Sequence, residues 1–141
     1  MASIFTKIIN GELPGRFLWR DDRAVAFLTI QPLKPGHALV VPIQEVDHWL
    51  DLEPDLARHL LDVSQLVGKA IDRAFRPAKV GLIIAGLEVS HVHLHVTPIH
   101  ALQDLNFANA DPNPDPAQMD AAAEKIREAL RELGCTEVAD S

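Results

Sequence analysis

The chain has 141 residues, a length that suits one domain with a hydrophobic core. Its 13 Lys and Arg residues against 20 Asp and Glu residues give a formal net charge of −7, which argues against broad nucleic-acid binding but not against a small anionic ligand. No apolar run approaches the roughly 18 residues of a membrane-spanning helix, and the polar N-terminus lacks a signal-peptide core, so we expect a soluble cytoplasmic protein without a membrane partner.

In chain order, the pattern predicts a short helix, three strands, a long helix, two strands and a closing helix. These elements span residues 3–10, 16–20, 24–30, 37–43, 54–75, 78–89, 91–99 and 117–133. We therefore expect a single α+β domain over residues 1–141 with a mainly antiparallel sheet. Residues 1–100 would form its core, and residues 101–141 a proline-rich loop and the closing helix.

The segment 78–89, "AKVGLIIAGLEV", is largely apolar and rich in Val and Ile, which favours a central strand. The one cysteine, Cys135, has no partner for an internal disulfide, and we interpret it as an incidental thiol.

Three histidines alternate with aliphatic residues in the next segment, "HVHLHV". Because side chains alternate along a strand, His91, His93 and His95 are expected on one face, with Cα atoms about 6.6 Å apart. The aliphatic residues would pack under a helix on the other face. Three imidazoles without polar partners would be costly to bury, so the histidine face is predicted to line a polar site.

Two kinds of chemistry fit this face. The histidines are candidate metal ligands, if the fold brings Glu88 or Asp47 close enough to complete a site. Alternatively, a neutral imidazole attacks phosphorus while its neighbours hold the phosphate and donate a proton. The residues of this strand alone leave both open.

The sequence segments around the histidines favour the second interpretation, nucleophilic attack at phosphorus. "HVHLHVT" is similar to the signature of the histidine triad (HIT) family, with Thr97 departing at its last, normally apolar position. "KIINGELP", the acidic turn "DD", "AFL" and "PGHALVVP" follow the order and spacing of the same family. The resemblance covers roughly residues 3 to 99.

The resemblance implies a five-stranded antiparallel sheet with helices, usually joined into a homodimer through a helix and an edge strand. It implies a hydrolase or transferase that acts on nucleoside monophosphates bearing a leaving group on the α-phosphate. His93 would be the nucleophile, His95 would contact the phosphate and the leaving group, and His91 and His37 would complete a supporting polar network. No metal or cofactor is required.

The chain departs from the family pattern at two sets of positions before residue 50. Many members bind zinc through cysteines and a histidine where this chain has Ser3, Thr6 and Glu45, so we expect no zinc site there. The Asp or Asn that usually holds the ribose is Thr29, although Ile30 keeps the apolar position against the base.

The segment before the triad, "GLIIAGLEV", also differs. Leu87 replaces a glutamine and Glu88 replaces a small hydroxyl residue, and no basic residue compensates. A carboxylate repels phosphate. We hypothesise that Glu88 favours a cationic or amine-bearing leaving group.

Two other functions stay open from the sequence. The altered ribose and phosphate positions are compatible with a dimer of the same fold that binds a nucleotide or a protein partner without turnover. A metal-dependent enzyme that uses the HxHxH face is the third possibility.

Overall fold

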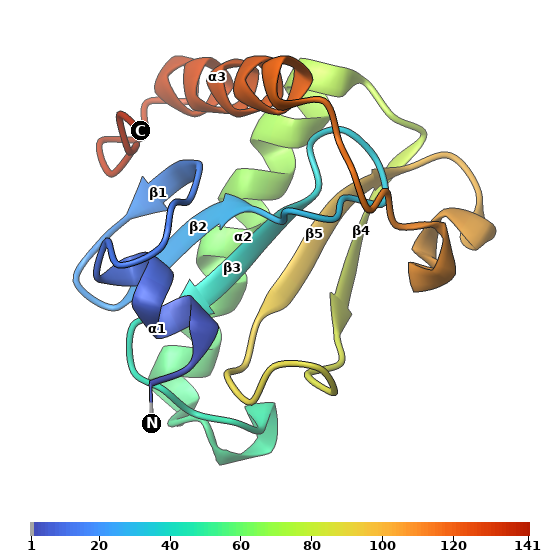
Figure 1. Ribbon diagram of the computed structural model, residues 1–141. Helices are drawn as coiled ribbons and strands as arrows, with labels where there is room; N and C mark the ends of the chain where they lie inside the picture. The colour runs from blue at the N-terminus through green and yellow to red at the C-terminus, as the bar shows by residue number, and fades with distance from the viewer. Residues whose placement is uncertain (1) are drawn as a thin grey trace.

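The computed structural model describes residues 2–141 and contains a five-stranded sheet with helices on both faces (Figure 1). Neighbouring strands are antiparallel throughout, and their order is β1-β2-β3-β5-β4. The strands are β1 (Phe17–Arg20), β2 (Ala24–Leu28), β3 (Ala38–Pro42), β4 (Lys79–Ile84) and β5 (Leu94–Ile99). The helices are α1 (Ile4–Ile9), α2 (Pro54–Phe75) and α3 (Pro116–Glu132). The predicted α+β class is confirmed.

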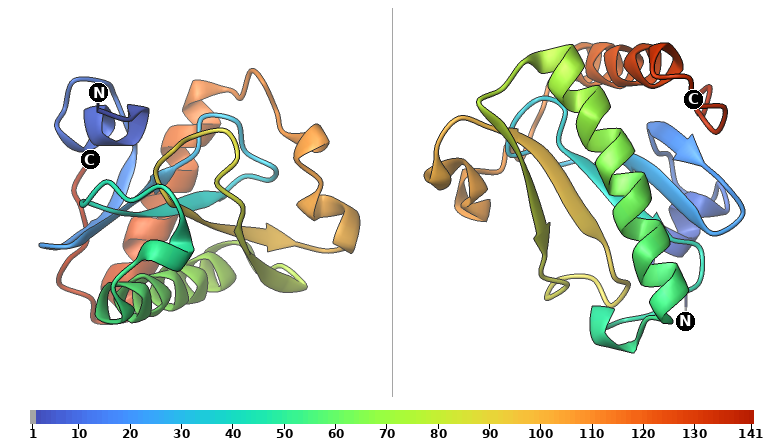
Figure 2. Two further views of the ribbon diagram at one scale, coloured as in Figure 1. Left: turned by 90° about the horizontal axis from the view of Figure 1, so that it is seen from below. Right: turned by 180° about the vertical axis from the view of Figure 1, so that it is seen from behind.

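The helices on the two faces of the sheet (Figure 2) cover cores of unequal size. Helices α2 and α3 cover one face, where side chains such as Leu60 and Ile126 are fully buried. Helix α1 covers part of the other face, where Phe5 and Ile8 pack against Phe27 of β2. Each such burial stabilises the fold by roughly 1.5–3 kcal/mol. No helix within residues 2–141 combines the length and apolarity needed to cross a bilayer.

The predicted histidine strand begins three residues later than expected. β5 starts at Leu94, so His91 and His93 precede it. The Val92 N–H donates to the Val46 carbonyl oxygen at 2.7 Å, so this stretch bonds to the loop after β3 instead of to a strand.

The prediction of a central strand over residues 78–89 is wrong in two respects. β4 ends at Ile84, and it is an edge strand of the sheet. Its apolar side chains are therefore not all buried within the chain, since Leu82 and Ile84 stay 47% and 36% exposed. The opposite edge, at β1, is covered by the C-terminal segment, where Val138 bridges to Trp19 and the Ala139 N–H donates to Leu18 O at 3.0 Å.

His59 of α2 is largely buried against the turn between β1 and β2. Its Nε2 lies 2.7 Å from Asp21 Oδ2, which also accepts the indole N–H of Trp19 at 2.8 Å. The contact ties α2 to the β1–β2 hairpin.

The Pro35-Gly36 turn delivers His37 to the start of β3. Gly36 has a φ of +96°, and a Cβ there would lie 2.6 Å from a ring carbon of Phe75. Only glycine meets both constraints without strain. The turn therefore sets where His37 enters the sheet.

Candidate functional site

The four predicted histidines, His37, His91, His93 and His95, come together on the face of the sheet that carries α1. His95 lies on β5 between Leu94 and Val96, which point into the core under α2. The rings of His93 and His95 are 4.9 Å apart between centroids, and those of His37 and His95 are 5.2 Å apart. His37, His91 and His93 are almost completely buried.

A backbone N–H fixes which nitrogen of His37 carries a hydrogen, and the His37 ring then fixes the same for His95. The Leu33 N–H donates to His37 Nδ1 at 3.0 Å, so the hydrogen of neutral His37 is on Nε2. His37 Nε2 in turn lies 3.0 Å from His95 Nδ1 and donates to it. His95 therefore keeps its own hydrogen on Nε2, as a donor.

The other two histidines are fixed by carbonyl oxygens, which can only accept. His91 Nε2 donates to the Pro42 carbonyl oxygen at 2.8 Å, and its Nδ1 accepts from the Ser3 hydroxyl at 2.6 Å. His93 Nδ1 donates to the backbone oxygen of His91 at 2.8 Å. Because neutral imidazole has one hydrogen, His93 Nε2 carries a lone pair.

Burial keeps all four imidazoles neutral at neutral pH. Desolvation is the largest cause for each of them. It lowers the pKa of His37 to about 3, with a further contribution from the charges of His95 and His93, and that of His95 to about 4, where His93 contributes. The pKa values of His91 and His93 are lowered as well, against the opposing effect of their hydrogen bonds to carbonyl oxygens. Neutral imidazole is the nucleophilic form.

The remaining predicted site residues lie in the loops that follow β2 and β4. The Thr29 N–H donates to the His37 carbonyl oxygen at 3.2 Å, which places Thr29 beside the turn, and Ile30 is 67% exposed. Leu87 and Glu88 lie in the exposed turn between β4 and β5. The Glu88 charge raises the pKa of His93, as a minor effect that opposes desolvation.

The residues do not fit a metal site. Within residues 2–141, no group of three or more His, Cys, Asp and Glu side chains is placed to hold a metal ion, and Asp47 and Glu88 do not join the histidines in one. At the positions where many HIT members bind zinc, Ser3 and Thr6 offer neutral hydroxyls, and both ring nitrogens of His91 are already hydrogen-bonded.

Two aromatic residues at the site were missed by sequence reasoning. The Phe5 ring of α1 packs against the rings of His91 and His93 in T-shaped arrangements, at 5.8 and 4.8 Å between centroids. Phe107, in the loop after β5, lies 4.8 Å from His95. Phe5 belongs to a segment that carries the resemblance, whereas nothing in the loop sequence indicated that Phe107 returns to the site.

Comparisons with known proteins point to one family. The HIT domain family model matches residues 10–102. A HIT-like protein from Borreliella burgdorferi is 37% identical over 102 residues, which cover 67% of this chain and 73% of that protein.

Two solved structures share the fold. A zinc-bound histidine triad family protein from Mycobacterium smegmatis is 25% identical, with a TM-score of 0.82 over 95% of this chain and 96% of that one. A hypothetical histidine triad nucleotide-binding protein from Sulfolobus tokodaii is 25% identical, with a TM-score of 0.80 over 92% of each chain.

Acidification is expected to destabilise the fold through His37. Below the unfolded pKa of 6.5, the unfolded chain binds a proton that folded His37, with a pKa of about 3, does not bind. This contribution to stability is fully present above pH 6.5 and is lost as the pH falls, by about 2 kcal/mol between pH 7 and pH 5. Urea unfolding at the two pH values measures the change.

His37→Gln is the matched control, because glutamine also accepts and donates a hydrogen bond but does not titrate. Its free energy of unfolding should fall less over the same pH interval, by about the same 2 kcal/mol. Equal losses in the two proteins would contradict the prediction.

Proposed function

We propose that this chain, which belongs to the HIT family, is a hydrolase or transferase that acts on the α-phosphate of a nucleoside monophosphate bearing a leaving group. The observation that carries the proposal is the order of hydrogens on the histidines. The bare Nε2 of His93 is the nucleophile, and the N–H of neighbouring His95 is the donor. The description of the Sulfolobus tokodaii relative as nucleotide-binding supports a nucleotide ligand.

The reaction proceeds in two displacements at phosphorus. The His93 Nε2 lone pair forms a bond to the α-phosphorus while the bond to the leaving group breaks, and the leaving group keeps that electron pair. His93 becomes positively charged, and its Nδ1–H shares this charge with the His91 carbonyl oxygen. Water or another acceptor then attacks phosphorus, the electron pair returns to Nε2, and the surplus proton passes to solvent.

The hydrogen bond from His37 limits what His95 does. Full transfer of the His95 Nε2 proton would leave an imidazolate, because Nδ1 accepts from His37 and carries no hydrogen. His95 therefore stabilises developing charge on the phosphate or leaving group as a hydrogen-bond donor. Leaving groups that are stable as free anions, such as phosphate, and amines that are already protonated are favoured over alkoxides, which need a proton as they depart.

The apolar and polar surroundings support a nucleoside substrate with such a leaving group. The exposed side chain of Ile30 offers an apolar contact for the base, and Thr29 a hydroxyl for the ribose. Leu87 and Glu88 flank the phosphate in this proposal. The Glu88 carboxylate favours a cationic amine, which would offset its repulsion of the phosphate.

A binding protein without turnover is the second candidate. The Thr29 hydroxyl already accepts from the Gln31 N–H at 3.3 Å, so it keeps one hydrogen to offer a ribose diol. The ribose position therefore departs from the Asp or Asn that is usual in the family, and this departure is compatible with nucleotide binding without turnover.

Nucleoside 5′-phosphates labelled at the α-phosphorus, with an amine, a phosphate or an alkoxide as leaving group, test the catalytic proposal. A burst of label on the protein is expected with amine and phosphate, at rates at least about 100-fold above alkoxide. The label should be absent in His93→Ala and present in His100→Ala, a control at an exposed histidine. Glu88→Ser should lower the rate ratio of amine to phosphate.

Label on the His93→Ala protein, or equal rates for all three leaving groups, would contradict the mechanism. Nucleotide binding by calorimetry without label on the wild-type protein would favour the binding role instead.

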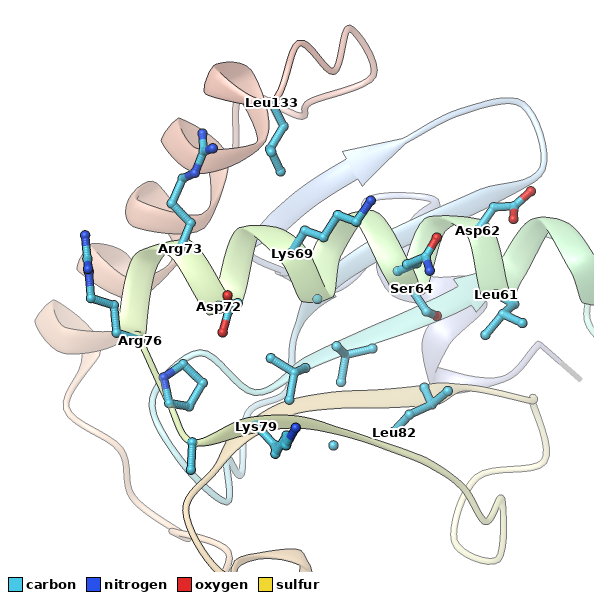
Figure 3. Close-up of a pocket in the computed structure, with 17 residues that line it drawn as sticks. Leu61, Asp62, Ser64, Lys69, Asp72, Arg73, Arg76, Lys79, Leu82 and Leu133 are labelled. Atoms are coloured by element: carbon cyan, nitrogen blue, oxygen red, sulfur yellow. The ribbon is translucent and has the colours of Figure 1, made fainter.

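We further propose that the protein is a homodimer through a groove between α2 and β4, of about 1110 Å³ (Figure 3). The groove lies on the face of the sheet opposite the histidines. Leu61 and Leu82 stay exposed along it, and β4 has unpaired backbone groups along its outer edge. An uncovered apolar edge strand is a site of pairing with another chain.

Leu82→Lys should convert the dimer to a monomer, because it places a charge in the groove. Light scattering is expected to give twice the chain mass of 15.5 kDa for the wild-type protein and the single mass for the variant. Leu102→Lys, at an 84% exposed leucine outside the groove, should stay dimeric. A monomeric wild-type protein would rule out the dimer.

A further inference from the structure

Where many HIT members bind zinc, this chain has a hydrogen-bonded group of side chains, here called the Ser3 cluster: Ser3, Thr6, Glu45 and His91. Ser3 is the N-cap of α1, and its hydroxyl accepts from the Thr6 N–H at 3.0 Å. Glu45, from the loop after β3, accepts from the Ser3 N–H and from the Thr6 hydroxyl, each at 2.7 Å. The cluster therefore joins the first turn of α1 to that loop and to His91.

Donor and acceptor are fixed in each hydrogen bond of the Ser3 cluster. The Pro42 carbonyl oxygen requires the His91 hydrogen on Nε2, so the His91 Nδ1 lone pair faces Ser3. The Ser3 hydroxyl gives its one hydrogen to this lone pair at 2.6 Å, in preference to Thr6 Oγ1 at 3.3 Å. The Thr6 hydrogen goes to Glu45. Both nitrogens of a fully buried ring are thus held by fixed partners.

The backbone of the same histidine carries the hydrogen-bond acceptor of the nucleophile. The His91 carbonyl oxygen accepts from His93 Nδ1–H, two residues along the chain. A ring held at both nitrogens restrains its own backbone, and with it the oxygen that selects the His93 tautomer. A misplacement near 1 Å at a supporting group is enough to cost about 100-fold in rate.

We propose that Ser3 and Glu45 are positioning residues, which hold His91 so that its carbonyl oxygen keeps the His93 Nε2 lone pair directed at phosphorus. In this proposal, hydrogen bonds fix the first histidine of the triad, His91. The inference rests on the proposed nucleophilic role of His93. It gives the N-terminus of α1 a role in catalysis. The Ser3 and Thr6 hydroxyls act there through His91 and do not touch the substrate.

Two matched pairs of variants test the proposal. Ser3→Ala and Glu45→Ala remove the hydrogen bonds, whereas Ser3→Thr and Glu45→Gln keep a hydroxyl and an acceptor oxygen. We expect the alanine variants to lower kcat by about 10- to 100-fold with KM within about twofold. The conservative variants should keep kcat within about threefold of wild type, as should Glu12→Ala, a control at an exposed glutamate.

Nitrogen-15 spectra of the imidazoles give a readout that does not depend on turnover. In the wild-type protein, His93 should be one neutral tautomer with its hydrogen on Nδ1. In the alanine variants it should be a mixture of both tautomers, while Ser3→Thr and Glu45→Gln keep the single form. If Ser3→Ala does not fold, the Glu45 pair carries the test alone.

Alanine variants with wild-type kcat and a single His93 tautomer would overturn the proposal. So would a Glu45→Gln variant as defective as Glu45→Ala, since the charge and not the hydrogen bonds would then matter. If the wild-type protein turns over no nucleotide, the proposed function fails, and the tautomer spectra still decide whether the Ser3 cluster positions His93.

Discussion

The hydrogen bond from His93 Nδ1 to the backbone oxygen of His91 is the interaction on which the chemistry of this site depends. It is 2.8 Å long and lies between two almost completely buried residues. A carbonyl oxygen cannot donate, so the bond leaves His93 one free nitrogen, and that nitrogen has a lone pair. A solvated histidine would sample both tautomers and, near its usual pKa, the cation as well.

The tautomers of His37 and His95 are also set by a backbone group, but here that group is a hydrogen-bond donor. A backbone N–H at Leu33 begins a chain of hydrogen bonds that ends on a hydrogen at His95 Nε2. A donor and an acceptor therefore stand side by side without any charge in the pair. This arrangement suits a chain with a net charge of −7, in which Lys34, three residues before His37, is already paired with Asp104 at 3.5 Å.

The sequence predicted those parts of the site that depend on local periodicity. Alternation placed His95 opposite Leu94 and Val96, and the helix over residues 54–75 matches α2. It did not predict that His91 and His93 precede the strand, because the backbone groups that bond to this stretch, at Pro42 and Val46, lie more than forty residues earlier in the chain. The apolar segment over residues 79–84 led to a wrong prediction for a related reason. An apolar composition suggests burial, but an edge strand with an exposed leucine has the same composition as a central strand.

The sequence also did not predict the side chains that join the site through tertiary contacts. Phe107 follows β5 by eight residues, and its loop is tied back by the Asp111 N–H, which donates to the Pro32 carbonyl oxygen at 2.9 Å. Ser3 and Glu45 are 42 residues apart, and the sequence indicated only that they are poor zinc ligands. They come within hydrogen-bond distance only in the folded chain, where α1 lies beside His91.

Neutron diffraction from a perdeuterated crystal at neutral pH tests the central claim most directly, because it locates hydrogen atoms on imidazole rings. The account predicts deuterium on Nδ1 of His93 and none on its Nε2, together with deuterium on Nε2 of His37, His91 and His95. Deuterium on Nε2 of His93, in either the neutral or the cationic ring, would contradict it.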